Sequence, residues 1–317
     1  YGDRISWLKA RQKGIGASDT PAILGISKWG SPLTVWENKV SHIDLLEDQS
    51  DFFRRRSNLE KIVAAEYKYL HQDQGRIVKN PGTYAIHRHS EHPWLQASLD
   101  REVHDPKRGW GVLECKTANS FRRGEWDDPD EPPLDYLVQV QHQMLVSGYT
   151  WGSLCVMLGL DEFRTYDIDF EPDFANVMLE RLKAFWGYVE RAEVPPVDST
   201  KATENAIKRL WPIDSGETIE LPQDAATWDT ERLNAIDRLK AAENDKRYYE
   251  NLLKTALGEA AYGTVGNVQY SHKTQTRKIS LSVDEEHADA LQAAGIPFKA
   301  TGGAVYRVLR RKELTHE

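Results

Sequence analysis

The stretch from residue 97 to residue 118 reads ASLDREVHDPKRGWGVLECKTA, and it decides the fold. Apolar and polar residues alternate on both sides of the turn-forming residues DPKRG, a pattern typical of two antiparallel strands joined by a hairpin. A loop made of these five residues places His104 opposite Trp110, and the same register places Asp100 opposite Glu114. The sequence therefore predicts a hairpin in which two carboxylates face each other.

Two opposed carboxylates repel each other unless a cation offsets their charge. Because side chains alternate along a strand, Glu114 and Lys116 point to one face and Cys115 points to the other. Mg²⁺ binds one or two carboxylates and completes its shell with water and phosphate oxygens, and it activates water for phosphodiester hydrolysis. The pattern thus predicts a metal-dependent site. An exposed hairpin with solvated charges is the alternative, since a glutamate two residues before a lysine is common.

The composition is that of a globular protein with one large domain, or with a main domain and a smaller attachment. The chain has 317 residues, of which 40% are hydrophobic, and a formal net charge of -8. This charge excludes binding of nucleic acid by bulk basicity, so a DNA partner requires local basic strips or a bound metal. Cys115 and Cys155 lie in apolar segments, which favours free thiols and the cytoplasm. No apolar run approaches the roughly 20 residues of a membrane span, so no membrane partner is expected.

Helical and strand patterns surround the hairpin in an order typical of an α/β protein. We expect short helices within residues 4–38, a helix over 53–70, strands over 83–87 and 94–103, a helix over 134–147, strands over 151–158 and 163–170, and a helix from Pro172. The resulting fold would be a mixed sheet flanked by helices.

A domain boundary is predicted at Pro195 and Pro196, because this pair ends a helix and residues 198–224 are polar and loop-like. The main domain would then span residues 1–196. In residues 197–317 we expect a long helix over 228–259, either an extended arm or a helical hairpin, and then a β-rich tail.

Five blocks of this sequence resemble the YqaJ viral recombinase family, in the family's order and at its usual intervals. That family includes lambda exonuclease and belongs to the PD-(D/E)xK nuclease superfamily. The blocks are RQKGIGASDTPAILGIS, SNLEKIVAAEY, HPWLQASLD, GVLECKTA and DYLVQVQHQMLVSG. The resemblance runs from Arg11 to about Pro195, and it implies a restriction-endonuclease-like core with a C-terminal helical arm and a β-rich tail.

The resemblance also implies roles for the hairpin residues. Asp100 and Glu114 correspond to the metal carboxylates, the carbonyl of Cys115 to a backbone metal ligand, and Lys116 to the catalytic lysine. The implied cofactor is Mg²⁺, with Mn²⁺ as a substitute. One position departs from the family, because Arg101 follows Asp100 where many relatives have glycine. We expect the hairpin to tolerate this arginine and the local DNA contact to differ.

Two polar residues outside the hairpin complete the implied catalytic site. Glu60 corresponds to an acidic residue that supports the metal or the water, and Gln139 to a glutamine that holds the lysine and the substrate. On a helix Tyr136, Gln139 and Gln143 share one face, which disfavours Gln141 as a contact. Ordinary solvent-facing polar side chains are the alternative for Glu60 and Gln139.

A binding pocket for a terminal 5′-phosphate is implied by Arg11 and Ser18, to which Lys28 would add charge. An arginine can bind phosphate through two hydrogen bonds, and a helix start offers free N–H groups to an anion. Here a helix start is predicted at Thr20 and Pro21, with the Thr20 hydroxyl as N-cap. Ser18 as a helix cap is the alternative. Arginines that precede Glu60 are further candidates for contact with backbone phosphate, namely Arg54, Arg55 and Arg56.

The leading functional hypothesis is a Mg²⁺-dependent 5′–3′ exonuclease of phage-type recombination. It would act on double-stranded DNA ends and leave 3′ single-stranded overhangs for a single-strand annealing protein. By resemblance we expect a homo-oligomeric ring, such as a trimer. One alternative is an endonuclease of the same superfamily, and another is a catalytically dead DNA-binding or assembly protein, which the intact Asp100, Glu114 and Lys116 disfavour. Two cysteines are too few for an iron–sulfur nuclease.

Overall fold

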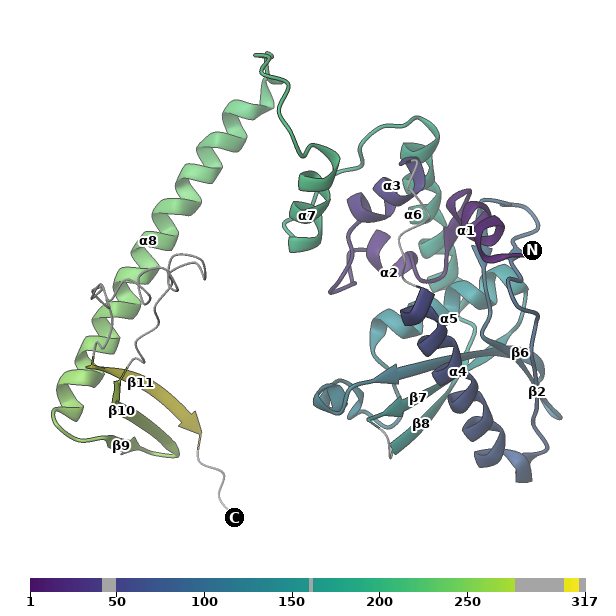
Figure 1. Cartoon of the computed structure of the whole chain (residues 1–317), viewed down its shortest axis with the longest axis horizontal. Coiled ribbons are helices and arrows are strands. Elements are labelled where there is room, and N and C mark those ends of the chain that lie inside the picture. Colours follow the sequence, from purple (N-terminus) through teal and green to yellow (C-terminus); the bar gives the residue numbers. More distant parts are fainter. Residues whose placement is uncertain (42–49, 160–161, 277–304, 314–317) are drawn as a thin grey trace, which may run out of the picture. The chain divides into compact units, whose positions relative to one another are not determined.

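The computed structural model describes residues 1–41, 50–159, 162–276 and 305–313, and the chain divides into two compact units, Tyr1–Ser215 and Gly216–Glu317 (Figure 1). The helices of the first unit are α1 (Arg4–Gln12), α2 (Thr20–Ile23), α3 (Pro32–Val40), α4 (Ser50–Leu70), α5 (Leu134–Ser147), α6 (Pro172–Glu190) and α7 (Lys201–Leu210). Two short 3₁₀ helices, η1 (Gln72–Gln74) and η2 (Ser120–Trp126), lie between them.

A five-stranded mixed sheet forms the centre of the first unit. Its strand order is β2 (Ile77–Lys79), β5 (Arg101–Asp105), β6 (Gly109–Ala118), β7 (Trp151–Leu158) and β8 (Glu162–Asp169). Neighbouring strands are antiparallel except β6 and β7, which run parallel because α5 carries the chain back between them. The predicted fold class, a mixed sheet flanked by helices and followed in the chain by a helical arm and a β-rich tail, is confirmed.

The hairpin of β5 and β6 has the predicted register. His104 pairs with Trp110, and the pairing continues to Arg101 opposite Leu113. Asp105 also pairs with Gly109, so the turn is two residues shorter than the five-residue loop expected from the sequence. Asp100 itself lies in the bend just before β5, directly before Arg101, which pairs with Leu113.

Helices cover both faces of this sheet, and alternate side chains of β6 are buried on opposite faces. Val112 packs in the larger core with residues of α5 and α6, whereas Leu113 packs in a second core with α4 residues such as Tyr67. Figure 1 shows α4 crossing the strands on its face. Because Glu114 and Lys116 alternate with Leu113, they lie on the α5 face.

A small second sheet brings the start of the chain to the hairpin. Its order is β1 (Ile15–Gly16), β4 (Leu95–Ala97) and β3 (His87–Arg88). β1 runs parallel to β4, and a Cβ on Gly14 would lie only 2.4 Å from the Trp94 carbonyl, so glycine is required for this close approach. The sequence did not predict β1. The strand expected over residues 83–87 is wrong except at its last residue.

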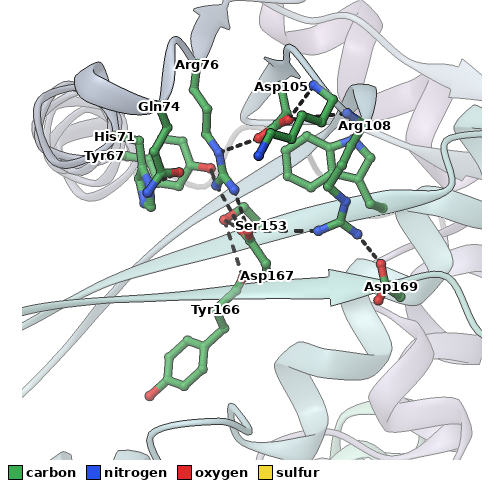
Figure 2. A network of polar contacts seen from close by, with 12 residues as sticks. Tyr67, His71, Gln74, Arg76, Asp105, Arg108, Ser153, Tyr166, Asp167 and Asp169 are labelled. Carbon is green, nitrogen blue, oxygen red and sulfur yellow. Dashed lines mark hydrogen bonds and ion pairs between the residues drawn. The ribbon is translucent and has the colours of Figure 1, made fainter.

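A polar network around Arg76 lies on the α4 face of the central sheet (Figure 2). Arg76 donates to Asp105 Oδ2 over 3.0 Å, to the Tyr67 hydroxyl over 2.6 Å and to Asp167 Oδ1 over 2.9 Å. Arg108 contacts Asp169 and stacks over the Trp151 ring, 4.6 Å from its centroid. These contacts tie the hairpin turn to α4 and β8. We call the set the Arg76 network: Tyr67, Arg76, Asp105, Arg108, Ser153, Asp167 and Asp169.

Helix α7 corrects the predicted domain boundary. Residues 198–224 were expected to form a loop, but α7 packs against α3, with Ala206 fully buried. Arg209 also pairs with Glu37 of α3, with its Nε 2.9 Å from Glu37 Oε1. The first unit therefore extends to Ser215, beyond the two prolines, because these contacts hold α7 on the main domain.

The second unit consists of one long helix and a small antiparallel sheet. Helix α8 (Asp224–Leu257) has 34 residues and no buried side chain, so the expected arm is a single helix and no helical hairpin forms within these residues. The sheet has the order β11 (Val305–Glu313), β10 (Val268–Thr276) and β9 (Tyr262–Val265), which confirms the β-rich tail; residues 277–304 lie outside the described part. Within the part of the chain that the structure describes, no helix is long and apolar enough to cross a membrane.

Candidate active site

The hairpin places Asp100, Glu114 and Lys116 together, as the sequence predicted. Asp100 Oδ2 accepts the backbone N–H of Cys115 over 2.9 Å, which fixes this carboxylate against β6. Lys116 Nζ lies 2.5 Å from Glu114 Oε1. Glu114 is almost completely buried, with 3% of its surface exposed. The three groups therefore form a cluster with Glu114 buried and Asp100 and Lys116 half-buried, and they are not part of an exposed hairpin surface.

Helix α5 supplies two amides to this cluster. Gln139 donates to Glu114 Oε1 over 2.6 Å and accepts from Lys116 Nζ over 2.9 Å, so it bridges the acid and the base. Gln143, one helical turn further on, donates to Glu114 Oε2 over 2.5 Å. Gln141 points elsewhere and donates to the Asp169 carbonyl. The predicted helix face is confirmed, but the contact of Gln143 was missed, although its spacing from Gln139 was the available signal.

The electrostatics of the cluster are unbalanced. Burial, together with the nearby carboxylates of Glu114 and Glu60, raises the pKa of Asp100 well above its ordinary value. Burial opposes the charged form of Lys116, but the carboxylates of Glu114 and Asp100 outweigh it and raise the pKa of this lysine. Burial also raises the pKa of the Cys115 thiol. Lys116 is therefore a protonated donor at neutral pH, and Cys115 offers its carbonyl and no thiolate.

Glu60 reaches the cluster from α4, but it has a partner that the sequence did not predict. Arg101 Nη1 lies 2.6 Å from Glu60 Oε1 and also contacts the main-chain carbonyl of Asp100. The Arg101 side chain is 12% exposed. Its only signal in the sequence was its place directly after Asp100.

One cavity of about 710 Å³ joins the carboxylates to the start of the chain. Its lining includes residues from α1, the loop after β1, α4, the hairpin and α5. Those used here are Arg11, Ser18, Arg54, Arg56, Glu60, Asp100, Arg101, Glu114 and Gln139. Acidic and basic side chains thus border the same space, which suits a substrate that carries phosphate beside a cation.

The expected phosphate-binding residues are brought together only in part. Arg11 donates to the Ser18 hydroxyl over 3.1 Å, and both line the cavity. Lys28 does not line it and instead pairs with Glu125, 3.0 Å away.

The predicted helix start near Ser18 is corrected in two respects. The N-cap of α2 is Asp19, without a side-chain capping bond, while the Thr20 hydroxyl contacts His142 Nδ1 at 2.7 Å. Ser18 therefore does not cap α2. Since α2 has only four residues, the argument from a helix terminus for anion binding does not hold.

The donor atoms suit a hard divalent cation. Among residues 1–41, 50–159, 162–276 and 305–313, no three His, Cys, Asp or Glu side chains are grouped to hold a metal ion. The carboxylates of Asp100 and Glu114 and the carbonyl of Cys115 are nevertheless oxygen donors of the kind that Mg²⁺ takes together with water and phosphate. The half-buried Asp100 carboxylate lies near those of Glu114 and Glu60, and burial together with these two groups raises its pKa. A bound cation would offset these negative charges.

Known proteins match both the sequence and the fold. The family profile described as YqaJ-like viral recombinase domain matches residues 6–150. The uncharacterised protein YqaJ of Bacillus subtilis (strain 168) is 30% identical over 286 residues, which cover 87% of each chain. A match that spans 87% of the 317 residues must include α8, Asp224–Leu257, whether it starts early or late in the chain. The sequence similarity to this relative therefore extends into the second unit.

Solved structures are similar at lower identity. An alkaline exonuclease of Laribacter hongkongensis, LHK-Exo in complex with dAMP, is 20% identical with a TM-score of 0.48, and the match covers 65% of this chain and 97% of that one. A phage-related exonuclease from Haemophilus somnus 129PT is 12% identical with a TM-score of 0.40, covering 56% of this chain and 94% of that one.

Proposed function

Because the chain belongs to the YqaJ-like viral recombinase domain family, a family of nucleases, we propose that it is a metal-dependent 5′–3′ exonuclease that degrades double-stranded DNA from its ends. It would leave 3′ single-stranded overhangs. The observation that carries this proposal is the shared cavity, which has Asp100 and Glu114 in one part of its lining and Arg11 and Ser18 in another.

We assign the binding of Mg²⁺, or of Mn²⁺ in its place, to the carboxylates of Asp100 and Glu114 and the carbonyl of Cys115. When bound, the ion would lower the pKa of a water molecule and balance charge on the scissile phosphate. Glu114 can keep its amide partners, because an ionised carboxylate offers about four lone-pair sites. Gln143 and Gln139 then act by holding this carboxylate in one orientation.

Lys116 would stabilise the charge that develops on the phosphate. Its raised pKa keeps a proton on Nζ, so it can donate a hydrogen bond to the phosphate. Gln139 accepts from Nζ and thereby aims the ammonium group. Preorganised donors of this kind contribute about 100-fold to 1000-fold to a rate.

Arg11 and Ser18 would hold the 5′-phosphate at the end of the duplex. A guanidinium can donate two hydrogen bonds to a phosphate, and Ser18 is exposed and already within reach of Arg11. Binding of the terminal phosphate would set the polarity of digestion, because it places the first phosphodiester bond toward the carboxylates.

The test compares three DNA substrates with Mg²⁺ present: linear duplex with a 5′-phosphate, the same duplex with a 5′-hydroxyl, and a closed circle. We expect rapid loss of the first, slow loss of the second and none of the third. Arg11→Gln should slow digestion of the phosphorylated duplex by about 10-fold to 100-fold, the equivalent of a lost charged hydrogen bond. Lys9→Gln removes an exposed charge from the same helix and is the control.

Two results would favour the other candidates. Equal cutting of closed circles would identify an endonuclease. If no DNA is lost with Mg²⁺ and Lys116→Ala changes nothing measurable, the chain is a DNA-binding or assembly protein.

The family resemblance supports further proposals on the domains, the assembly and the partners of this chain. We assign the nuclease to the unit Tyr1–Ser215 and an accessory role to the arm and the tail. A homo-oligomeric ring, such as a trimer, would keep this acidic chain on DNA by topology, and an annealing protein would receive the overhang. Its place of action would be the cytoplasm, which suits two free cysteines.

A further inference from the structure

The guanidinium of Arg101 forms part of the cavity lining, beside Glu60 and Asp100. It lies between two oxygen atoms of different origin, the Glu60 carboxylate of α4 and the main-chain carbonyl of Asp100. A carboxylate and a carbonyl are also the donors that a hard divalent ion takes. Because an arginine does not lose its proton in proteins, this positive charge is permanent.

The side chains of Asp100 and Arg101 point in different directions because the two residues are adjacent at the start of β5. Arg101 follows Asp100 directly, so its side chain turns toward α4 and Glu60, while Asp100 binds the N–H of Cys115 in β6. The Arg101 side chain is 12% exposed and that of Glu60 29%. Their contact is therefore shielded from solvent, and it is stronger than a surface ion pair.

A charge count shows what this contact leaves for metal ions. The acidic groups of the cluster are Glu60, Asp100 and Glu114, and the basic groups are Arg101 and Lys116. Arg101 balances Glu60 and Lys116 balances Glu114, so one negative charge remains uncompensated, at Asp100. One divalent ion satisfies that charge. A second ion at Glu60 would have to displace a guanidinium that is covalently held in place.

We propose that Arg101 is a built-in cation that takes the place of a second metal ion at Glu60, so that each chain binds one divalent ion, at Asp100 and Glu114. This rests on the proposed metal-dependent function and specifies its stoichiometry. Arg101 is thus a residue that determines which part of the cavity accepts metal, and Glu60 acts through it to position the hairpin.

The test counts bound ions directly. The full-length chain is stripped with EDTA and titrated with Mn²⁺, and the free ion is measured by electron paramagnetic resonance. We expect one bound Mn²⁺ per chain before mutation and two in Arg101→Gln, because Glu60 and the Asp100 carbonyl are then released. The double variant Arg101→Gln with Glu60→Gln should return to one, since the second site needs the Glu60 carboxylate.

Two further variants serve as controls. Arg101→Lys keeps a positive charge at this position and should bind one ion. Lys79→Gln removes a charge that pairs with Glu102 on the neighbouring strand, 3.6 Å away, and should also bind one. Circular dichroism of each variant establishes that it is folded before ions are counted.

The inference is overturned if the unchanged chain binds two ions, or if folded Arg101→Gln still binds one. DNA digestion measured on the same samples separates this failure from that of the proposed function. An active chain that binds two ions overturns only the role of Arg101. A chain that binds no Mn²⁺ and digests no DNA overturns both proposals.

Discussion

Two polar clusters lie on opposite faces of the same sheet, and they treat their carboxylates in opposite ways. In the Arg76 network, the carboxylates of Asp105 and Asp167 both contact the Arg76 guanidinium (Figure 2). In the active-site cluster, the carboxylate of Asp100 forms no ion pair with a lysine or arginine within the described residues, although Arg101 contacts its main-chain carbonyl. The pKa of Asp105 is lowered, first by the backbone N–H of Lys107 and also by Arg76, and that of Asp167 is lowered chiefly by Arg76. The pKa of Asp100 is raised, by burial and by the carboxylates of Glu114 and Glu60.

The presence or absence of a guanidinium partner distinguishes the Arg76 network, which is structural, from the active-site cluster. A buried carboxylate with a guanidinium partner and further hydrogen bonds is satisfied, and it holds its elements together. A buried carboxylate beside another carboxylate has electrostatic energy that a cation can relieve. Gln139 and Gln143 orient Glu114 but bring no charge, so they leave this imbalance in place. Proximity of acids alone would not distinguish the two faces, whereas the distribution of positive charge does.

The largest expected effect is on activity. Asp100→Asn should reduce Mg²⁺-dependent digestion of linear DNA at least about 1000-fold, because the metal supplies several kcal/mol of transition-state stabilisation and the amide binds it poorly. Asp167→Asn, on the other face, should leave the initial rate at low temperature close to that of the unchanged chain. If Asp100→Asn keeps its rate, the carboxylate cluster does not hold the ion.

The second largest expected effect is the loss of stability when the Arg76 network is disrupted. Arg76→Met should lower the free energy of unfolding by about 3 kcal/mol, because it removes the guanidinium from Asp105 and leaves Asp167 with only the more distant Arg108. The low end of the usual range applies, since the Asp167 side chain is 35% exposed. Urea unfolding followed by tryptophan fluorescence measures this change. Arg108→Met is the matched control and should cost less than about 1 kcal/mol, because Asp169 is 76% exposed and Asp167 lies 3.9 Å from Arg108 Nη1 and keeps Arg76.

The same comparison predicts that one of these substitutions stabilises the protein. Without divalent metal, Asp100→Asn should raise the free energy of unfolding by about 0.5 to 2 kcal/mol, because it removes a charge that burial and the carboxylates of Glu114 and Glu60 oppose. Urea unfolding in EDTA tests this. A destabilised Asp100→Asn would mean that the hydrogen bond from Cys115 outweighs the repulsion.

The sequence predicted those parts of the site that depend on local geometry. The register of the hairpin follows from its turn and its alternation, and the shared face of Gln139 and Gln143 follows from helical spacing. Contacts between distant segments were not predictable in this way. Arg101 contacts Glu60, 41 residues away in the sequence, and the Thr20 hydroxyl contacts His142, 122 residues away. Because of this contact, the Thr20 hydroxyl does not cap α2 as expected.

Tertiary packing also explains the two errors in the fold. Residues 201–210 look like a polar loop because their apolar residues are few, yet α3 provides a surface on which Ala206 is buried. β1 has only two residues, which is too short to show alternation, and it forms because β4 pairs with it. Both elements depend on a partner that is remote in sequence.

The smallest expected effect is a dependence of stability on pH that has opposite signs on the two faces. Burial opposes ionisation of Asp167, but hydrogen bonds from Arg76 and Ser153 outweigh it and lower its pKa. Its stabilising contribution is therefore present above the unfolded pKa of about 3.9 and is lost as the pH falls through the lower folded value. For Asp100, with its raised pKa, the contribution is present below about 3.9 and is lost as the pH rises through the folded value.

Thermal unfolding in EDTA between about pH 3 and pH 7 resolves these signs, because each Asp→Asn variant removes one titrating group. The Tm advantage of the unchanged chain over Asp167→Asn should shrink as the pH falls toward 3. The unchanged chain should have a lower Tm than Asp100→Asn, and this deficit should also shrink as the pH falls, since protonated Asp100 no longer repels Glu114. The Tm of the unchanged chain minus that of the variant should therefore fall for Asp167→Asn and rise toward zero for Asp100→Asn. If this signed difference moves in the same direction for both variants, the two faces do not differ in the balance of their charges.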